Sequence, residues 1–223
     1  TASSPEFAGR IDPASTDVTG NGRGYNDANS DGHGMDVAAV LLAARNGQNT
    51  VGIAYDATLI ALRADRPGSC MSNGLPASES GCRFTDDSIA AGVDAAVNAG
   101  ARVINISLGG SAPSMVLRSA VQRATGQGVV IVLSAGNDGQ STDPALDPNN
   151  PDPFAQGLVD AGRGLVIIAG SNSDTGVISD FSNRAGSYAN SYLLALGDRV
   201  CCDYQNGILR EEQTAQGTVI YLL

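Results

Sequence analysis

The chain contains a single histidine, His33, among its 223 residues. An imidazole is the side chain best suited to proton transfer near neutral pH, so we consider His33 a candidate for that role. Basic residues are also scarce, since 13 Lys and Arg stand against 23 Asp and Glu and give a formal net charge of −10. A surface with this charge repels polyphosphate, so we expect no nucleic-acid partner.

Long apolar runs are missing as well. None approaches the roughly 18 residues that a membrane-spanning helix needs, so we expect no membrane contact from this segment. The hydrophobic content of 42% is ordinary for a globular protein. We interpret residues 1–223 as one domain, because this length suits a single well-buried core. No charged-then-apolar leader opens the chain, so we expect any secretion signal to be removed or to lie outside this sequence.

Metal-ligand patterns are absent or incomplete. There is no C-x-x-C pair beside the single histidine, which argues against zinc. The stretch 27–32 matches the start of a calcium loop, but Ala38 stands where a bidentate glutamate is required. We therefore expect no metal and no cofactor.

The four cysteines indicate a disulfide. Cys70 and Cys82 flank a Gly-, Ser- and Pro-rich stretch, and their spacing suggests that they close a surface loop. Four cysteines allow three pairings, however, and the adjacent Cys201 and Cys202 have no assigned partner. A disulfide favours an oxidising compartment.

Short apolar runs alternate along the chain with segments of helical periodicity. We expect exposed loop over the polar stretch 13–31. Strands are expected at 58–64, 103–108, 129–133, 165–169 and 192–195, and helices at 37–44, 85–100 and 111–124. In the last of these helices one face is apolar, and it carries Leu117, Ala120, Val121 and Ala124.

This alternation is typical of βαβ units, and strands that are apolar at every position are expected to be covered on both faces. The sequence therefore predicts an α/β fold with a mainly parallel sheet. Ligands bind at the carboxyl ends of the strands in such sheets. Two of those ends, 105–110 and 133–139, leave the sheet through glycine and other small residues, so backbone groups there can approach a bound chain closely.

Motifs in a consistent order along the whole chain resemble the subtilisin-like serine proteases. His33, between two glycines in 31–39, resembles the family's histidine motif, and 52–63 resembles the strand that follows it. Val103–Gly109 resembles the substrate-binding strand, Ser134–Gly139 the oxyanion segment, and Phe181–Asn183 a later motif. The chain is most similar to bacterial secreted and autotransporter members. The resemblance implies a three-layer α/β sandwich of the subtilisin type.

The resemblance also implies a role for each matching residue. His33 would be the general base that takes a proton from a serine hydroxyl and later gives it to the leaving amine. Asn137 would donate its side-chain amide to the oxyanion of the tetrahedral intermediate. Five further residues would contact an extended polypeptide substrate, three by strand addition and two in the pocket for the side chain before the cut. They are Ser107, Leu108, Gly109, Ala135 and Gly136.

Two members of the family's catalytic triad have no match in the chain. The aspartate is expected before Thr1, and the serine after the strand that Thr218–Leu223 resembles. We therefore expect a partial catalytic domain that folds poorly and is inactive alone, while the complete protein hydrolyses peptide bonds through an acyl-enzyme. Met35 and Asp36 depart from the histidine motif, and they keep open the alternative of a non-catalytic peptide-binding domain.

The expected location follows from the cysteines and from the resemblance. We expect a bacterial protein that is secreted, at the cell surface or in the periplasm. Its expected partner is a polypeptide substrate, and the sequence sets no oligomeric state.

Overall fold

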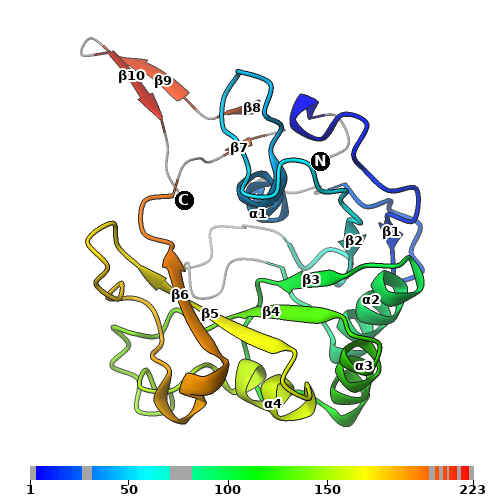
Figure 1. The fold of residues 1–223 in the computed structure, drawn as a ribbon, viewed down its shortest axis with the longest axis vertical. Helices are drawn as coiled ribbons and strands as arrows, with labels where there is room; N and C mark the ends of the chain where they lie inside the picture. Colours follow the sequence, from blue (N-terminus) through cyan, green and yellow to red (C-terminus); the bar gives the residue numbers. More distant parts are fainter. Residues whose placement is uncertain are drawn as a thin grey trace. The chain divides into compact units, whose positions relative to one another are not determined.

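The computed structural model describes residues 4–26, 32–70, 82–200, 204–205, 208–209, 211–214 and 217–220. The chain divides into two compact units, residues 1–88 with 199–223 and residues 89–198, and each is described by itself (Figure 1). The single domain expected over 1–223 stays a prediction. Most of the calcium-like stretch 27–32 and the pair Cys201-Cys202 lie outside the described residues.

Helix α1 (His33–Leu42) forms the core of the first unit. Its buried face packs against Phe7 of the short helix η1 (Pro5–Phe7), with Ile11 and Leu59 beside it. The helix begins at His33 rather than at the predicted residue 37, because Gly32 with φ 64° turns the chain directly into it. The buried apolar residues of this helix and its C-cap are Met35, Ala38, Ala39, Leu42 and Ala43, and Asp36 is buried with them.

Two short parallel strands, β1 (Thr16–Asp17) and β2 (Leu62–Arg63), also belong to the first unit. The prediction of exposed loop over 13–31 is therefore wrong at β1. The predicted strand 58–64 is reduced to β2, with a separate bridge between Leu59 and Ile11. Apolar periodicity could not find β1, because its stability comes from a buried carboxylate.

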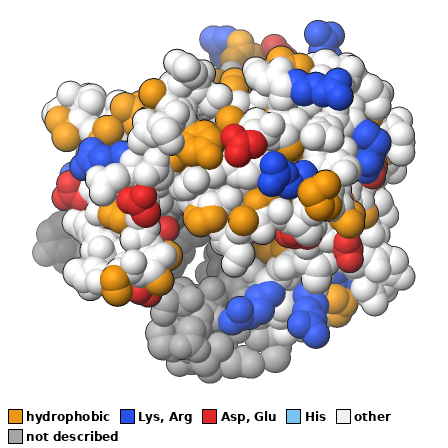
Figure 2. All heavy atoms as spheres, turned by 90° about the horizontal axis from the view of Figure 1, so that it is seen from below, with side chains coloured by type: hydrophobic (Ala, Val, Ile, Leu, Met, Phe, Trp, Pro, Cys, Tyr) orange, Lys and Arg blue, Asp and Glu red, His pale blue; other side chains and the backbone are white. Residues whose placement is uncertain are grey.

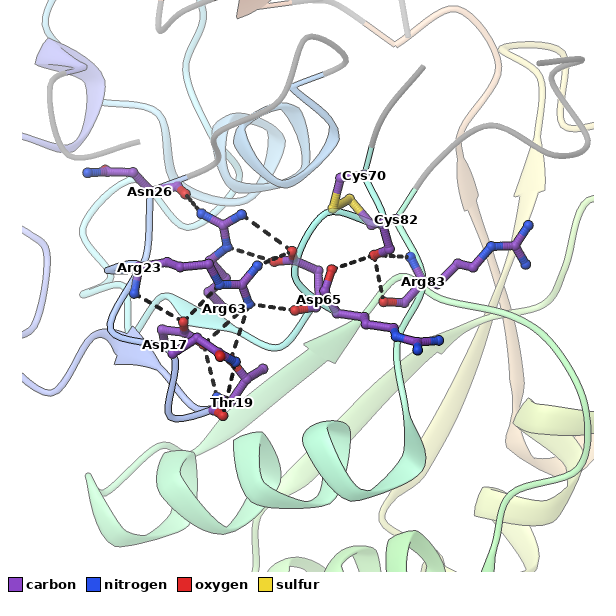
Figure 3. A network of polar contacts seen from close by, with 12 residues as sticks. Asp17, Thr19, Arg23, Asn26, Arg63, Asp65, Cys70, Cys82 and Arg83 are labelled. Carbon is purple, nitrogen blue, oxygen red and sulfur yellow. Dashed lines mark hydrogen bonds and ion pairs between the residues drawn. A yellow bond between two sulfur atoms is a disulfide. The ribbon is translucent and has the colours of Figure 1, made fainter. Parts of the chain in front are cut away.

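That carboxylate belongs to Asp17, whose side chain is 2% exposed (Figure 3). Arg23 donates from Nε to Asp17 at 3.0 Å and from Nη1 to Asp65 at 2.6 Å, and Arg63 donates to Asp65 at 2.7 Å. Burial alone would raise the pKa of Asp17, but hydrogen bonds from Arg23 and Thr19 outweigh it and hold the pKa well below its usual value. The two arginines lower the pKa of Asp65 in the same way against its burial.

A disulfide joins Cys70 and Cys82, which confirms the predicted pairing. The chain segments that lead to it are themselves paired. Arg66 N–H donates to the Arg83 carbonyl at 2.8 Å, and Asp65 forms an antiparallel bridge with Phe84. The disulfide therefore closes a loop whose base is already held by backbone hydrogen bonds.

Four parallel strands form the sheet of the second unit, in the order β3-β4-β5-β6 (Figure 1). They are β3 (Val103–Ile106), β4 (Val130–Ser134), β5 (Val166–Asn172) and β6 (Tyr192–Leu196). Every residue of β4 and β5 is buried or half-buried, as predicted. Coverage on both faces is wrong for β6, an outer strand of this sheet, which exposes Leu193, Leu194 and Leu196.

Three helices accompany this sheet: α2 (Asp86–Asn98), α3 (Met115–Gly126) and α4 (Pro153–Ala161). α3 contacts β4, α4 contacts β5, and the two helices contact each other. The predicted apolar face of α3 is confirmed, since its four residues are fully buried. α3 begins at Met115 rather than 111, after Pro113 and the N-cap Ser114. The alternation of parallel strands and helices confirms the predicted α/β class.

The remaining elements are short. The 3-10 helix η2 (Gly186–Ser191) leads into β6. In the first unit β7 (Tyr204–Gln205) pairs antiparallel with β8 (Ile208–Leu209), and β9 (Glu211–Thr214) with β10 (Gly217–Ile220). On the face seen in Figure 2, arginines, carboxylates and apolar side chains are interspersed. Within the described part of the chain, no helix has both the length and the apolar character to cross a bilayer.

Candidate functional site

His33 is the first residue of α1 and is exposed. The glycines on either side of it carry no side chain that would crowd the imidazole. Met35, which departs from the expected motif, is 3% exposed and packs in the core of the first unit, so it anchors the helix that carries His33. The imidazole is thus presented at a fixed helix start and is open to a reacting group.

A cavity of about 560 Å³ lies in the second unit, at the carboxyl ends of β3 and β4. This is the edge at which the sequence predicts ligand binding in a parallel sheet. The residues that line it are Gly109, Gly110, Ser111, Ser134, Gly136, Asn137, Asp138, Ala145, Leu146, Asp152 and Pro153.

One wall of the cavity follows β3, an outer strand of the described sheet. Val130 N–H donates to the Arg102 carbonyl, so in this register even-numbered residues direct their backbone groups toward β4. If the same alternation continues one residue past the strand, the backbone groups of Ser107 face away from β4. Ser134 Oγ donates to the Leu108 carbonyl at 2.8 Å and ties the two strand ends together.

Asp152 connects both walls of the cavity. Its backbone N–H donates to the Ala135 carbonyl at 2.8 Å, and its carboxylate accepts from Gly110 N–H at 2.7 Å. The same carboxylate caps α4 by accepting from Phe154 N–H at 2.8 Å. Burial raises the pKa of Asp152, these N–H groups oppose the rise, and the nearby charge of Asp138 adds to it.

In the second wall of the cavity, hydrogen bonds hold the residues on either side of Asn137 but not Asn137 itself. Asp138 N–H donates to Asn183 Oδ1 at 2.6 Å, Gly139 N–H to the Phe181 carbonyl at 2.8 Å, and Asn183 N–H to the Gly136 carbonyl at 3.1 Å. Among the described residues none makes a hydrogen bond with Asn137. Its exposed carboxamide, at the cavity, is free to donate to a ligand.

The predicted site residues are thus distributed between the two units. Gly109, Gly136 and Asn137 line the cavity. Ser107 and Leu108 follow β3 beside it, and Ala135 is buried at 2% exposure. His33 belongs to the first unit. The roles assigned to all of them stay predictions.

Sequence reasoning missed Asp152 in the cavity lining, and it gave no role to Asp138 or Asn183 although both lie in matched motifs. The dipeptide Asp152-Pro153 carries a usable signal, since aspartate at an N-cap followed by proline typically starts a helix. Nothing in the local sequence reveals the contacts of Asn183. No group of three or more His, Cys, Asp or Glu side chains in the described ranges is placed to hold a metal ion.

Comparison with known sequences identifies relatives of the chain. The sequence profile of the subtilase family matches residues 2–218. Subtilisin DY of Bacillus licheniformis is 36% identical over 120 residues, which cover 54% of this chain and 39% of the relative. Subtilisin Savinase of Lederbergia lenta is 39% identical over 108 residues, covering 48% and 35%. The chain thus spans less than half the length of these relatives.

Comparison with solved structures confirms the fold. A mutant of the protease domain of PatA superposes with a TM-score of 0.62 at 26% identity, covering 88% of this chain and 61% of that one. The prenylagaramide maturation protease PagA has a TM-score of 0.64 at 20% identity and covers 99% and 64%. The predicted subtilisin-like α/β fold is therefore confirmed.

Proposed function

We propose, from the premise that the chain belongs to the subtilase family, that the complete protein is a serine endopeptidase acting through an acyl-enzyme. One observation carries the proposal within the structure. Asn137 presents an uncommitted carboxamide at a cavity, on a backbone that its neighbours hold in place. A preorganised amide donor of this kind stabilises the oxyanion that develops when a peptide carbonyl is attacked.

The remaining parts of the mechanism are assigned to specific groups. His33 takes the proton of the attacking serine and returns it to the leaving amine. No segment of the chain matches the family's motif for the serine or for the aspartate that orients His33, so the proposal requires both from the rest of the complete protein. The polypeptide to be cut pairs by its backbone with the sheet edge at Ser107 and Gly109. The side chain that precedes the cut enters the cavity beside Gly136.

A fluorophosphonate probe tests this proposal, because it reacts covalently only with an activated serine. We expect the complete, folded protein to be labelled, and we expect His33→Gln to abolish labelling because the serine then lacks its base. Gln122→Ala, an exposed change on α3, serves as the matched control and should label normally. Failure of the parent protein to label, with its fold intact, would contradict the proposal.

A second candidate is a peptide-binding domain without hydrolysis. The open edge at Ser107 favours it, because strand addition needs backbone groups alone and no triad. This function predicts that an extended peptide binds the unlabelled protein and is recovered uncut. Mass spectrometry of the peptide after incubation separates the two candidates.

The location is proposed on similar grounds. The Cys70–Cys82 disulfide persists in an oxidising compartment, and the relatives carry the names of bacterial subtilisins and alkaline proteases. We infer a secreted or cell-surface protein. Fractionation of the source cells, with the protein detected outside the cytoplasm, checks this.

A further inference from the structure

We propose that Asn183 is a positioning residue for catalysis, which acts by holding Asn137 in the geometry that binds the oxyanion. This inference rests on the proposed function. It concerns a residue 46 positions beyond Asn137 that is not part of the cavity lining but bonds to Gly136 and Asp138, which are.

The contacts of Asn183 fall on both sides of Asn137. Its backbone N–H donates to the carbonyl of Gly136, and its side-chain Oδ1 accepts from the N–H of Asp138 at 2.6 Å. These are the residues immediately before and after Asn137. Since Asn137 itself bonds to no other described residue, its orientation depends on these two bonds more than on any contact of its own.

Asn183 is fixed in turn, so it can serve as a rigid support. It is 1% exposed. Its Nδ2 donates to the Asn150 carbonyl at 3.1 Å, which requires the amide oxygen to face Asp138. Its own carbonyl accepts from the Tyr192 hydroxyl at 2.6 Å. The support therefore reaches back to β6, the strand on which Tyr192 lies.

Gly136 allows this close approach. Its φ of 103° lies in a region that side-chain-bearing residues rarely adopt, and a Cβ there would lie 3.0 Å from Asn183 Cγ. The glycine thus lets the amide of Asn183 pack directly against the turn that presents Asn137. Gly136 and Asn183 are thus packed together, so a shift of the Asn183 amide would also shift Asn137, the proposed oxyanion donor.

Kinetics of the complete protein tests the proposal. We expect Asn183→Ala to lower kcat about 10- to 100-fold, since small misplacements of catalytic groups have effects of this size. KM should change less than about threefold, because the β3 edge that binds the peptide is untouched and the backbone bond from residue 183 to Gly136 remains. The control is Thr125→Ala, which removes a buried hydroxyl that donates to the Val121 carbonyl within α3 at 2.9 Å. It should leave kcat within about twofold.

A double-mutant cycle with Asn137→Ala distinguishes positioning from simple structural damage. If Asn183 acts through Asn137, then Asn183→Ala causes no further loss of kcat once the carboxamide of Asn137 is gone. An equal loss in both backgrounds, or a rise in KM alone, overturns the proposal. Failure of the proposed function is a separate result, because the parent protein itself would then show no turnover.

A second variant keeps the test available if Asn183→Ala does not fold. Asn183→Asp resembles the parent when protonated, since its O–H can donate to Asn150 and its carbonyl can accept from Asp138. When ionised it loses that donor. We expect its kcat relative to the parent protein to rise as pH is lowered, and a constant ratio would contradict the proposal.

Discussion

At the scale of single residues, the candidate site combines one exposed side chain that has no hydrogen bond to the described residues with buried side chains that are fully hydrogen-bonded. Asn137 is exposed and bonds to no other described residue, whereas Asp152 and Asn183 are buried and fully engaged in holding the turns around it. This division has a physical reason. An oxyanion donor must be unoccupied before the reaction, and its cost of reorganisation is low only if its surroundings are rigid.

This predicts a large effect of removing the donor itself. Asn137→Ala should lower kcat by about 100- to 1000-fold with little change in KM, because the carboxamide binds the oxyanion and not the ground-state peptide. Steady-state kinetics of the complete protein measures this. Asn98→Ala, an exposed change at the end of α2, is the control. A mutant with parental kcat would show that the oxyanion is stabilised elsewhere.

At the scale of elements, strands β1 and β2 depend on buried charge. Asp17, Asp65, Arg23 and Arg63 replace the apolar contacts that a two-residue strand pair cannot supply (Figure 3). Removal of one partner leaves a buried charge without compensation, which is more costly than the pair was favourable.

We therefore expect Arg23→Gln to destabilise the protein by about 3 to 5 kcal/mol at pH 7, measured by urea unfolding. The control is Arg123→Gln, which breaks an ion pair with Asp94 whose side chains are 53% and 42% exposed. Its expected effect is below about 1 kcal/mol. Equal effects of the two substitutions would show that the network contributes no more than a surface pair.

The same network predicts a pH dependence. The pKa values of Asp17 and Asp65 are lowered in the folded protein, so their contribution to stability is complete above the unfolded-state pKa of about 4 and is lost as pH falls below it. The difference in unfolding free energy between parent and Arg23→Gln should accordingly shrink between pH 5 and 2. A difference that is constant over this range would contradict the assigned ionisation.

At the scale of the whole molecule, the two residues with proposed catalytic roles belong to different units, His33 to the first and Asn137 to the second. The proposed function therefore requires both units to be folded. The Cys70–Cys82 disulfide is a covalent restraint on the first of them, and it joins residues 12 apart in sequence.

Closing a loop of this length should stabilise the folded state by about 3 kcal/mol through the entropy of the unfolded chain. We expect the double variant Cys70→Ser with Cys82→Ser to lower the urea midpoint correspondingly. Reduction of the parent protein should have a similar effect, and reduction of the double variant should add little. A midpoint that does not move in the double variant would show that the restraint is not significant in solution.

The sequence by itself determined the α/β class, the family and the apolar face of α3. The buried face of α3 shows why, since Leu117, Ala120, Val121 and Ala124 recur at helical spacing and the periodicity is a local property. The chain segments that approach the cavity were also predicted, because glycine-rich strand ends of a parallel sheet meet at one edge.

Only the tertiary structure decided how those segments are held. Asp152 reaches Gly110 across 42 residues, and Asn183 reaches Asp138 across 45. Both bonds exist because strand order brings distant turns together, and no local periodicity encodes that order. β1 was missed for the same reason, since Asp17 depends on Asp65 through Arg23 and not on apolar alternation.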